Sequence, residues 1–250
     1  MDILGLFGLF LAFASLIIAE SITGGSLSFL LNLAAFVIVF GGTIGAVLFQ
    51  STADQFGHAI RLLPQLITPD VLPVKRQTAK LKQWASTART QGFLALEADI
   101  DNTKLDSFTS KGLSMIVDGV DAITLRSVLE QDVDLKQEYY ERSAKVYEAM
   151  GGYSPTVGII GAVLGLIQAM SNIDDPSVLG RGIAAAFVAT IYGVGFANFV
   201  FLPICHKLRA LNYKQTLYHE MTIEGLVAIV NGENALVIER RLESFATERH

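Results

Sequence analysis

Residues 149–173 read AMGGYSPTVGIIGAVLGLIQAMSNI and residues 182–205 read GIAAAFVATIYGVGFANFVFLPIC, without a single Asp, Glu, Lys, Arg or His. Each stretch can cross a hydrocarbon layer about 30 Å thick, because a helix rises about 1.5 Å per residue. Two more uncharged runs occupy residues 3–19 and 21–53. The chain therefore predicts four membrane-spanning helices, at about Ile3–Ile22, Leu27–Phe49, Gly152–Met170 and Gly182–Ile204.

The basic residues predict the orientation of these spans. Of the 19 Lys and Arg residues, twelve lie between Arg61 and Lys145 and six between Lys207 and Arg249, and only Arg181 lies elsewhere. Lys and Arg gather on the cytoplasmic side of membrane spans. Both basic blocks, and with them both chain termini, are therefore expected in the cytoplasm.

The polar region between the second and third spans has the pattern of helices. Apolar residues recur at helical spacing over Arg76–Ala98, Thr103–Val117 and Asp121–Met150, and no alternation is long enough for a sheet. We expect an all-α, four-helix transmembrane protein with a helical cytoplasmic domain between spans two and three. The expected segments are a transmembrane hairpin (1–50), the cytoplasmic helical domain (51–150), a second transmembrane pair (151–205) and a cytoplasmic tail (206–250). The hairpin is expected to turn at Thr23–Ser26, and the tail is expected to form helices at Tyr218–Val230 and Ala235–Phe245.

Composition narrows the class of function. A hydrophobic share of 51% and a mean hydropathy of +0.44 exceed those of usual soluble domains, and a net charge of −5 argues against nucleic acid as a partner. The four His residues and the lone Cys205 lack the spacing of metal ligands, and no phosphate loop or nucleophile motif occurs. We therefore expect that the protein is not an enzyme and that it has neither a cofactor nor a metal site.

The inner pair of spans has two informative features. Small residues recur every four positions, at Gly161 and Gly165 and at Ala189, Gly193 and Ala197, which predicts close helix packing in an oligomer-forming layer. A protein that moves an ion alone normally keeps an ionisable group within the bilayer. Spans three and four have none, so if this chain moves ions, a partner has to bring the titrating group.

Two prolines lie near the cytoplasmic ends of this pair, Pro155 in span three and Pro203 in span four. A proline inside a helix removes one backbone hydrogen bond and bends the helix, whereas a proline at a helix end disturbs nothing. From position alone, both interpretations stay open.

Five local strings follow one another along the chain: Gln91–Glu97 (QGFLALE), Val117–Gly119 (VDG), Ser154–Gly161 (SPTVGIIG), Ala189–Gly193 (ATIYG) and Glu224–Ile229 (EGLVAI). Each string alone is unspecific, but their shared order across nearly the whole chain is specific. In these strings, and in the order of spans and helical domain, the chain resembles the MotA/PomA family of bacterial flagellar stator proteins.

The resemblance implies that five copies surround a dimer of a MotB-like subunit, whose transmembrane Asp binds and releases the ion. Spans three and four then line the ion path, with Ala162, Thr190 and Tyr192 toward the partner. The complex is implied to lie in the lipid of the bacterial inner membrane, to couple ion flow to torque, and to drive the rotor switch protein FliG.

The same resemblance assigns roles to two more pairs of residues. Arg89 and Glu97 take the basic and acidic positions of the family's rotor interface. Pro155 and Pro203 match the family's two proline positions, which implies a role for both in helix motion.

The coupling ion follows from a departure within the third span. Sodium-driven relatives carry a Thr hydroxyl where Ala162 stands, so only Thr190 of span four remains here. Sodium needs several oxygen ligands to replace its hydration shell, while a proton needs one carboxylate and a water path. We therefore predict a proton-driven stator, unless Ala162 is a packing choice and backbone carbonyls or water supply the missing ligands.

Two alternatives belong to other classes of membrane protein. A TolQ/ExbB-like subunit that uses the proton-motive force shares the plan of a ring around a partner, but such chains usually have three spans. The first hairpin here argues against it. A self-sufficient transporter would need a buried ionisable group, which the inner spans lack.

Overall fold

The computed structural model describes residues 3–22, 24, 31–69, 71–102 and 105–247, and most of these residues are helical, with no strand among them. In the described part of the chain, three helices are long and apolar enough to cross a membrane: Leu33–Gln50, Ala122–Met170 and Pro176–Val230. A fourth, α1 (Ile3–Ile22), has a shorter apolar stretch at Phe7–Ala19. The all-helical fold predicted from the sequence is confirmed. The turn predicted at Thr23–Ser26 lies outside the described residues except for Gly24.

The chain forms two compact units by its internal contacts. Unit 1 comprises residues 1–69 and 140–209, and unit 2 comprises residues 70–139 and 210–250. The division of the chain into four segments along the membrane normal stays a prediction.

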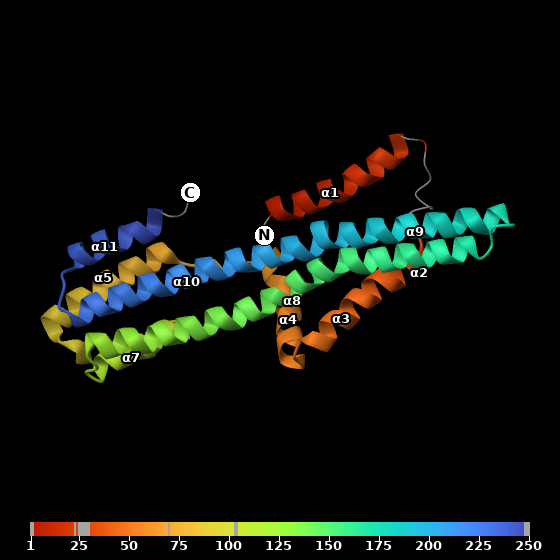
Figure 1. Cartoon of the computed structure of the whole chain (residues 1–250). Coiled ribbons are helices and arrows are strands. Elements are labelled where there is room, and N and C mark those ends of the chain that lie inside the picture. Colours follow the sequence, from red (N-terminus) through yellow and green to blue (C-terminus); the bar gives the residue numbers. More distant parts are fainter. Residues whose placement is uncertain (1–2, 23, 25–30, 70, 103–104, 248–250) are drawn as a thin grey trace. The chain divides into compact units, whose positions relative to one another are not determined.

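Two long helices contribute residues to both units (Figure 1). The helix α8 (Ala122–Met170) joins the expected last cytoplasmic helix and the third span without a break. The helices α9 (Pro176–Phe196) and α10 (Leu202–Val230) are continuous through a π-helical turn, η4 (Ala197–Phe201). Asp175 caps α9, because its side chain accepts hydrogen bonds from the backbone of the first turn.

The second span is built in the same way in unit 1. It consists of α2 (Leu33–Phe36), a π-helical turn η2 (Val37–Gly41) and α3 (Gly42–Gln50). It faces α8 closely, since a Cβ on Gly42 would lie 2.8 Å from Val157. The hydroxyl of Tyr153 also donates to the side-chain oxygen of Gln50 at 2.8 Å.

Sequence analysis missed the helix α4 (Ala53–Ile67). The glycine and proline within it obscured its apolar stripe, although Thr52 caps it through a hydrogen bond from Gln55. Ala59 and Leu62 of α4 are buried in the same cluster as Tyr147 and Met150 of α8. Tyr147 also donates its hydroxyl hydrogen to the Ala59 carbonyl at 2.8 Å.

Unit 2 is a helical bundle around the second half of α10. Its other helices are α5 (Val74–Gln91), η3 (Phe93–Leu96), α6 (Glu97–Asn102), α7 (Ser107–Val117), the first part of α8, and α11 (Ala235–Thr247). Gly225 of α10 lets α5 approach, because a Cβ there would lie 2.5 Å from Leu81. Gln77 of α5 donates to the hydroxyls of Thr109 on α7 and Thr222 on α10, at 2.9 and 3.4 Å. These contacts fix the register of three helices.

The helices continue through both candidate prolines. Pro155 lies inside α8, and Pro203 lies inside the continuous helix Pro176–Val230. Neither proline marks a helix end, so the interpretation that both prolines lie at helix ends is wrong. Pro203 has no N–H to donate to the Phe199 carbonyl, and the π-helical turn η4 immediately precedes it.

Candidate functional site

The α8–α9 pair is held together at glycines. A Cβ on Gly158 would lie 2.9 Å from the Ala189 carbonyl oxygen, and one on Gly193 would lie 2.7 Å from the Ser154 carbonyl oxygen. Further along, a Cβ on Gly165 would lie 2.9 Å from the backbone of both Ala186 and Gly182. The two backbones therefore touch along the stripe of small residues that the sequence predicted.

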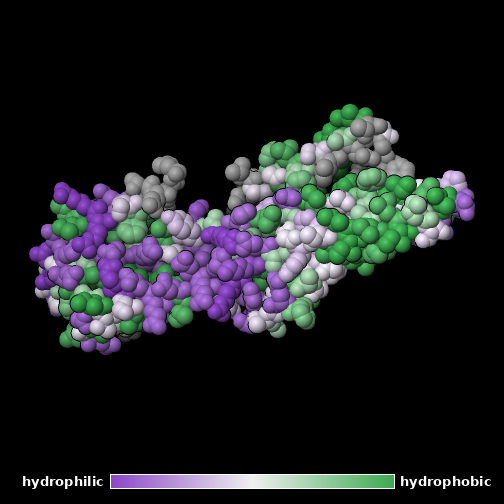
Figure 2. Space-filling model, viewed as in Figure 1, coloured by the Kyte–Doolittle hydropathy of each residue, from purple (hydrophilic) through white to green (hydrophobic). Residues whose placement is uncertain are grey.

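The other faces of this pair are apolar and exposed. Large hydrophobic side chains line α8 at Ile159, Ile160, Val163, Leu164, Leu166 and Ile167, and α9 at Phe187, Ile191 and Val194. Figure 2 shows hydrophobic side chains gathered over the α8–α9 pair. So much exposed apolar surface has to meet lipid or other protein chains.

Ala162 and Thr190 lie on facing helices, each within one helical turn of the same contact. A Cβ on Gly161 would lie 2.9 Å from the Ala189 Cβ, and the two candidate residues each follow one of these contact residues. Ala162 and Thr190 are both half-buried. The Thr190 hydroxyl donates to the Ala186 carbonyl of its own helix at 3.3 Å, so its oxygen keeps acceptor capacity.

Tyr192 belongs to a different contact, with the second span. The backbone N–H of Asn32 donates to the Tyr192 hydroxyl at 3.3 Å, just before α2 begins. The rings of Tyr192 and Phe36 meet edge to face with centroids 6.3 Å apart. Tyr192 therefore ties α9 to the start of α2.

Two hydroxyls in the membrane part of unit 1 are fully buried. The side-chain oxygens of Thr43 on α3 and Ser154 on α8 have no hydrogen-bond partner among the described residues. A buried hydroxyl without a partner costs about 1–3 kcal/mol. Ser154 immediately precedes Pro155 and faces the close contact at Gly193.

An arginine clamp joins α8 to α10 in unit 1. Arg209 donates from Nε and Nη2 to Glu141, and from Nη1 and Nη2 to Glu148, over 2.6–3.1 Å. The Arg209 hydrogen bonds hold the pKa of the Glu148 carboxyl below its usual value, against a smaller opposing effect of burial. The same hydrogen bonds raise the pKa of Arg209. The Arg209–Glu148 pair therefore keeps both charges in the physiological pH range.

Arg89 and Glu97 lie in unit 2 on either side of one turn. Arg89 is in the last turn of α5, Gly92 ends that helix with a φ of +82°, and Glu97 begins α6. A positive φ favours glycine, so the turn depends on this residue. Both charged side chains are exposed, and the Trp84 ring nitrogen holds α6 against α5 by donating to Asp99 at 2.9 Å.

The structure therefore brings the candidates together in part. Ala162 and Thr190 flank one helix contact, and Arg89 and Glu97 flank one turn, whereas Tyr192 contacts the second span. Sequence reasoning missed the Arg209 clamp and the two π-helical turns. Only the turn η4 had a signal in the sequence, namely Pro203.

Comparisons with known proteins agree with this geometry. Residues 100–221 match the MotA/TolQ/ExbB proton channel family. The chain is 35% identical to chemotaxis protein PomA of Vibrio alginolyticus, over 99% of this chain and 96% of that protein. It is also 35% identical to motility protein A of Bacillus subtilis, over 97% of this chain and 90% of that protein.

Solved structures give the same result. The MotAB structure of C. jejuni superposes with a TM-score of 0.92 at 27% identity, covering 98% of this chain and 96% of that chain. The flagellar MotAB stator complex of Bacillus subtilis superposes with a TM-score of 0.87 at 33% identity, covering 96% and 94%. These full-length relatives are motility proteins, which favours a stator over the TolQ/ExbB-like alternative. The chain therefore belongs to the MotA/PomA family and is a flagellar motor stator subunit.

Proposed function

We propose that this stator subunit couples proton flow, rather than sodium flow, to rotation, on a carboxylate supplied by a MotB-like partner. The observation that carries the proposal is the chemistry of the α8–α9 pair. Its spans, Gly152–Met170 and Gly182–Ile204, contain no Asp, Glu, Lys, Arg or His. An ion that moves along this pair must therefore be bound by a group from another chain.

The oxygen atoms at the proposed ion path favour the proton. Ala162 presents a methyl group within about one helical turn of Thr190, so one side-chain hydroxyl is available where sodium would need several oxygen ligands. A proton needs the partner's carboxylate and a chain of water. Tyr192 would support this path by fixing α9 against the second span.

The remaining parts of the proposal follow from what the resemblance to the MotA/PomA family implies. Five copies would surround the partner dimer, with the exposed apolar faces of α8 and α9 against partner and lipid. The complex would lie in the bacterial inner membrane with both termini cytoplasmic. Arg89 and Glu97, exposed and of opposite charge, would dock on the rotor protein FliG by charge complementarity. Pro155 and Pro203 would let the inner helices bend as the ring turns.

The test is the swimming speed of a strain that relies on this stator. Speed should be unchanged when potassium replaces sodium at constant pH, and should fall when a protonophore is added. Ala162→Thr, which adds a hydroxyl, should weaken the dependence on protons. Ala162→Val adds nearly the same volume without the hydroxyl and should keep that dependence. Speed that follows sodium and resists the protonophore would overturn the proposal.

A further inference from the structure

Three large apolar side chains are exposed where helices of unit 2 begin, and we call them the apolar tip: Leu94 of η3, Ile123 of α8 and Leu236 of α11. They are 73%, 82% and 57% exposed. Each lies two positions before a residue that is buried in one hydrophobic cluster, namely Leu96, Leu125 and Ile238. The buried residues hold these three segments on the bundle, so the apolar tip is a fixed part of its surface.

The starts of η3 and α11 lie at the same end of the bundle. The helix α5 runs parallel to the second half of α10, because Gln77 donates to Thr222 and a Cβ on Gly225 would lie 2.5 Å from Leu81. The ends of α5 and α10 therefore point the same way (Figure 1). After a short turn, η3 follows α5 and α11 follows α10.

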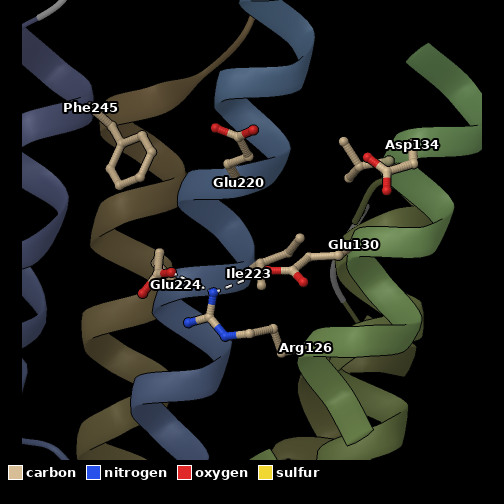
Figure 3. A pocket seen from close by; sticks show the side chains of 8 residues that line it. Arg126, Glu130, Asp134, Glu220, Ile223, Glu224 and Phe245 are labelled. Carbon is tan, nitrogen blue, oxygen red and sulfur yellow. Dashed lines mark hydrogen bonds and ion pairs between the residues drawn. The ribbon is translucent and has the colours of Figure 1, made fainter. Parts of the chain in front are cut away.

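The start of α8 lies at this end as well. Arg126 of α8 pairs with Glu224 of α10 at 2.7 Å, and the hollow beside this pair extends to Asp134 and Glu220 (Figure 3). Later residues of α8 therefore face earlier residues of α10, so the two helices run in opposite directions. Ile123 lies about one turn before Arg126, toward the end where α10 finishes.

Charges of both signs flank Leu94. It lies five residues after Arg89 and three residues before Glu97, and Gly92 turns the chain between α5 and η3 with a φ of +82°. Both charged side chains are exposed. A partner that binds Arg89 and Glu97 together therefore also has to cover Leu94.

This arrangement has the composition of a protein–protein interface. Single apolar residues scattered over a protein surface are common and need no explanation. Here three of them share one end of a bundle beside charged residues, which matches the apolar centre and polar rim of an interface. In such interfaces the rim charges mainly set the rate and orientation of binding, while side chains that lose contact with water supply most of the affinity.

We propose that the apolar tip is the central contact of the rotor docking surface, with Leu94 covered by an apolar side chain of the rotor protein. The partner surface that fits has an acidic group facing Arg89, a basic group facing Glu97 and apolar side chains between them. Continuity with these two charges assigns the tip to the rotor protein rather than to a second copy of this chain. This inference rests on the proposed function, which assigns the two charges, and adds the contact that holds the rotor protein once the charges have oriented it.

The test is photo-cross-linking in flagellated cells that rely on this stator. A photoreactive phenylalanine analogue replaces Leu94, Ile123 or Leu236, one at a time, and the covalent products are identified by mass spectrometry. Each position should give a product of this chain with the rotor protein. Leu135 is the matched control, because it is 59% exposed on α8 but lies about 18 Å along the helix axis from Ile123, so it should give no such product. All four side chains are exposed, so their replacement removes no buried contact.

The positions of the products separate the two levels of inference. The same analogue at the exposed Thr90, beside Arg89, tests the proposed docking without removing either charge. A rotor product at Thr90 without one at Leu94 would leave the docking standing and refute the apolar contact. A product of Leu94 with a second copy of this chain would make the tip a contact between copies and would also refute the proposal. No rotor product at any position would refute the docking itself.

Swimming speed gives a second, independent measurement. Leu94→Gln keeps both charges but replaces the apolar contact by a polar side chain, so it should lower the speed by at least about twofold at equal amounts of membrane-assembled protein. Leu94→Met keeps an apolar side chain and should keep the speed, and so should Leu135→Gln. Equal speeds for Leu94→Gln and the parent chain would overturn the proposal.

Discussion

The close contact between α8 and α9 predicts a sharp difference between two glycines of α9. A Cβ added at Gly193 would lie 2.7 Å from the Ser154 carbonyl oxygen, 3.0 Å from the Gly158 Cα and 3.2 Å from the Pro155 Cα. All three are backbone atoms, which cannot rotate away. A Cβ added at Gly195 would meet nothing within 4 Å. Gly195→Ala is therefore the matched control for Gly193→Ala.

The size of the effect follows from two opposing contributions. Replacing glycine by alanine inside a helix stabilises it by about 0.5–1 kcal/mol. Forcing a methyl group into a packed interface costs about 1–3 kcal/mol, because the helices separate and lose dispersion contact. Gly195→Ala has only the stabilising contribution, because its methyl group meets no other atom within 4 Å. For a chain of this length, about 1 kcal/mol shifts the unfolding midpoint by roughly 2–4 °C.

The assay is the thermal midpoint of the purified stator complex in detergent, read as the fraction that stays monodisperse after heating. The net cost of Gly193→Ala is up to about 2.5 kcal/mol, so we expect its midpoint to fall by up to about 10 °C, and that of Gly195→Ala to rise by about 1–4 °C. Equal midpoints for the two variants would show that α8 and α9 do not meet at Gly193. The packing argument for the ion-path pair would then fail.

Two further predictions concern charged and titratable side chains outside the spans. Arg209→Ala removes the clamp on Glu141 and Glu148 and should lower the free energy of unfolding by about 1–2 kcal/mol. Arg209→Lys keeps the positive charge but lacks the forked guanidinium, so it should lower the free energy of unfolding by less. Equal losses for the two variants in thermal unfolding would contradict a role for the guanidinium fork. Burial, with a smaller effect of Lys136, lowers the pKa of His219 to about 4. As the pH falls, the His219 side chain is therefore protonated in the unfolded chain before it is protonated in the folded protein. The free energy of unfolding should fall as the pH drops from about 6.5 toward 4. The acid-linked loss should reach about 2 kcal/mol after solvent screening is allowed for, and His219→Phe should remove it in unfolding curves at pH 7.5 and pH 5.

Much of the fold could be predicted because its signals are local. An uncharged run such as residues 182–205 determines a span by its length, and Asp175 and Pro176 determine where α9 begins. The stripe from Gly161 to Gly165 predicted a close helix contact, since small residues serve little other purpose at that spacing. The structure confirms these elements, except that α4 is an additional helix with a glycine and a proline inside it.

The site was less predictable because its contacts join distant residues. Glu141 and Arg209 are 68 positions apart, and each alone has the composition of a solvated helix face. The π-helical turn η2 has no proline after it, so nothing in Val37–Gly41 distinguishes it from an ordinary helix.

Charge in unit 2 shows the same limit. Glu220 and Glu224 look like ordinary surface acids in the sequence, and Asp134 stands almost ninety positions before them. All three line one hollow together with Arg126. Their proximity depends on the packing of α8 against α10, so no local pattern in the sequence could predict it.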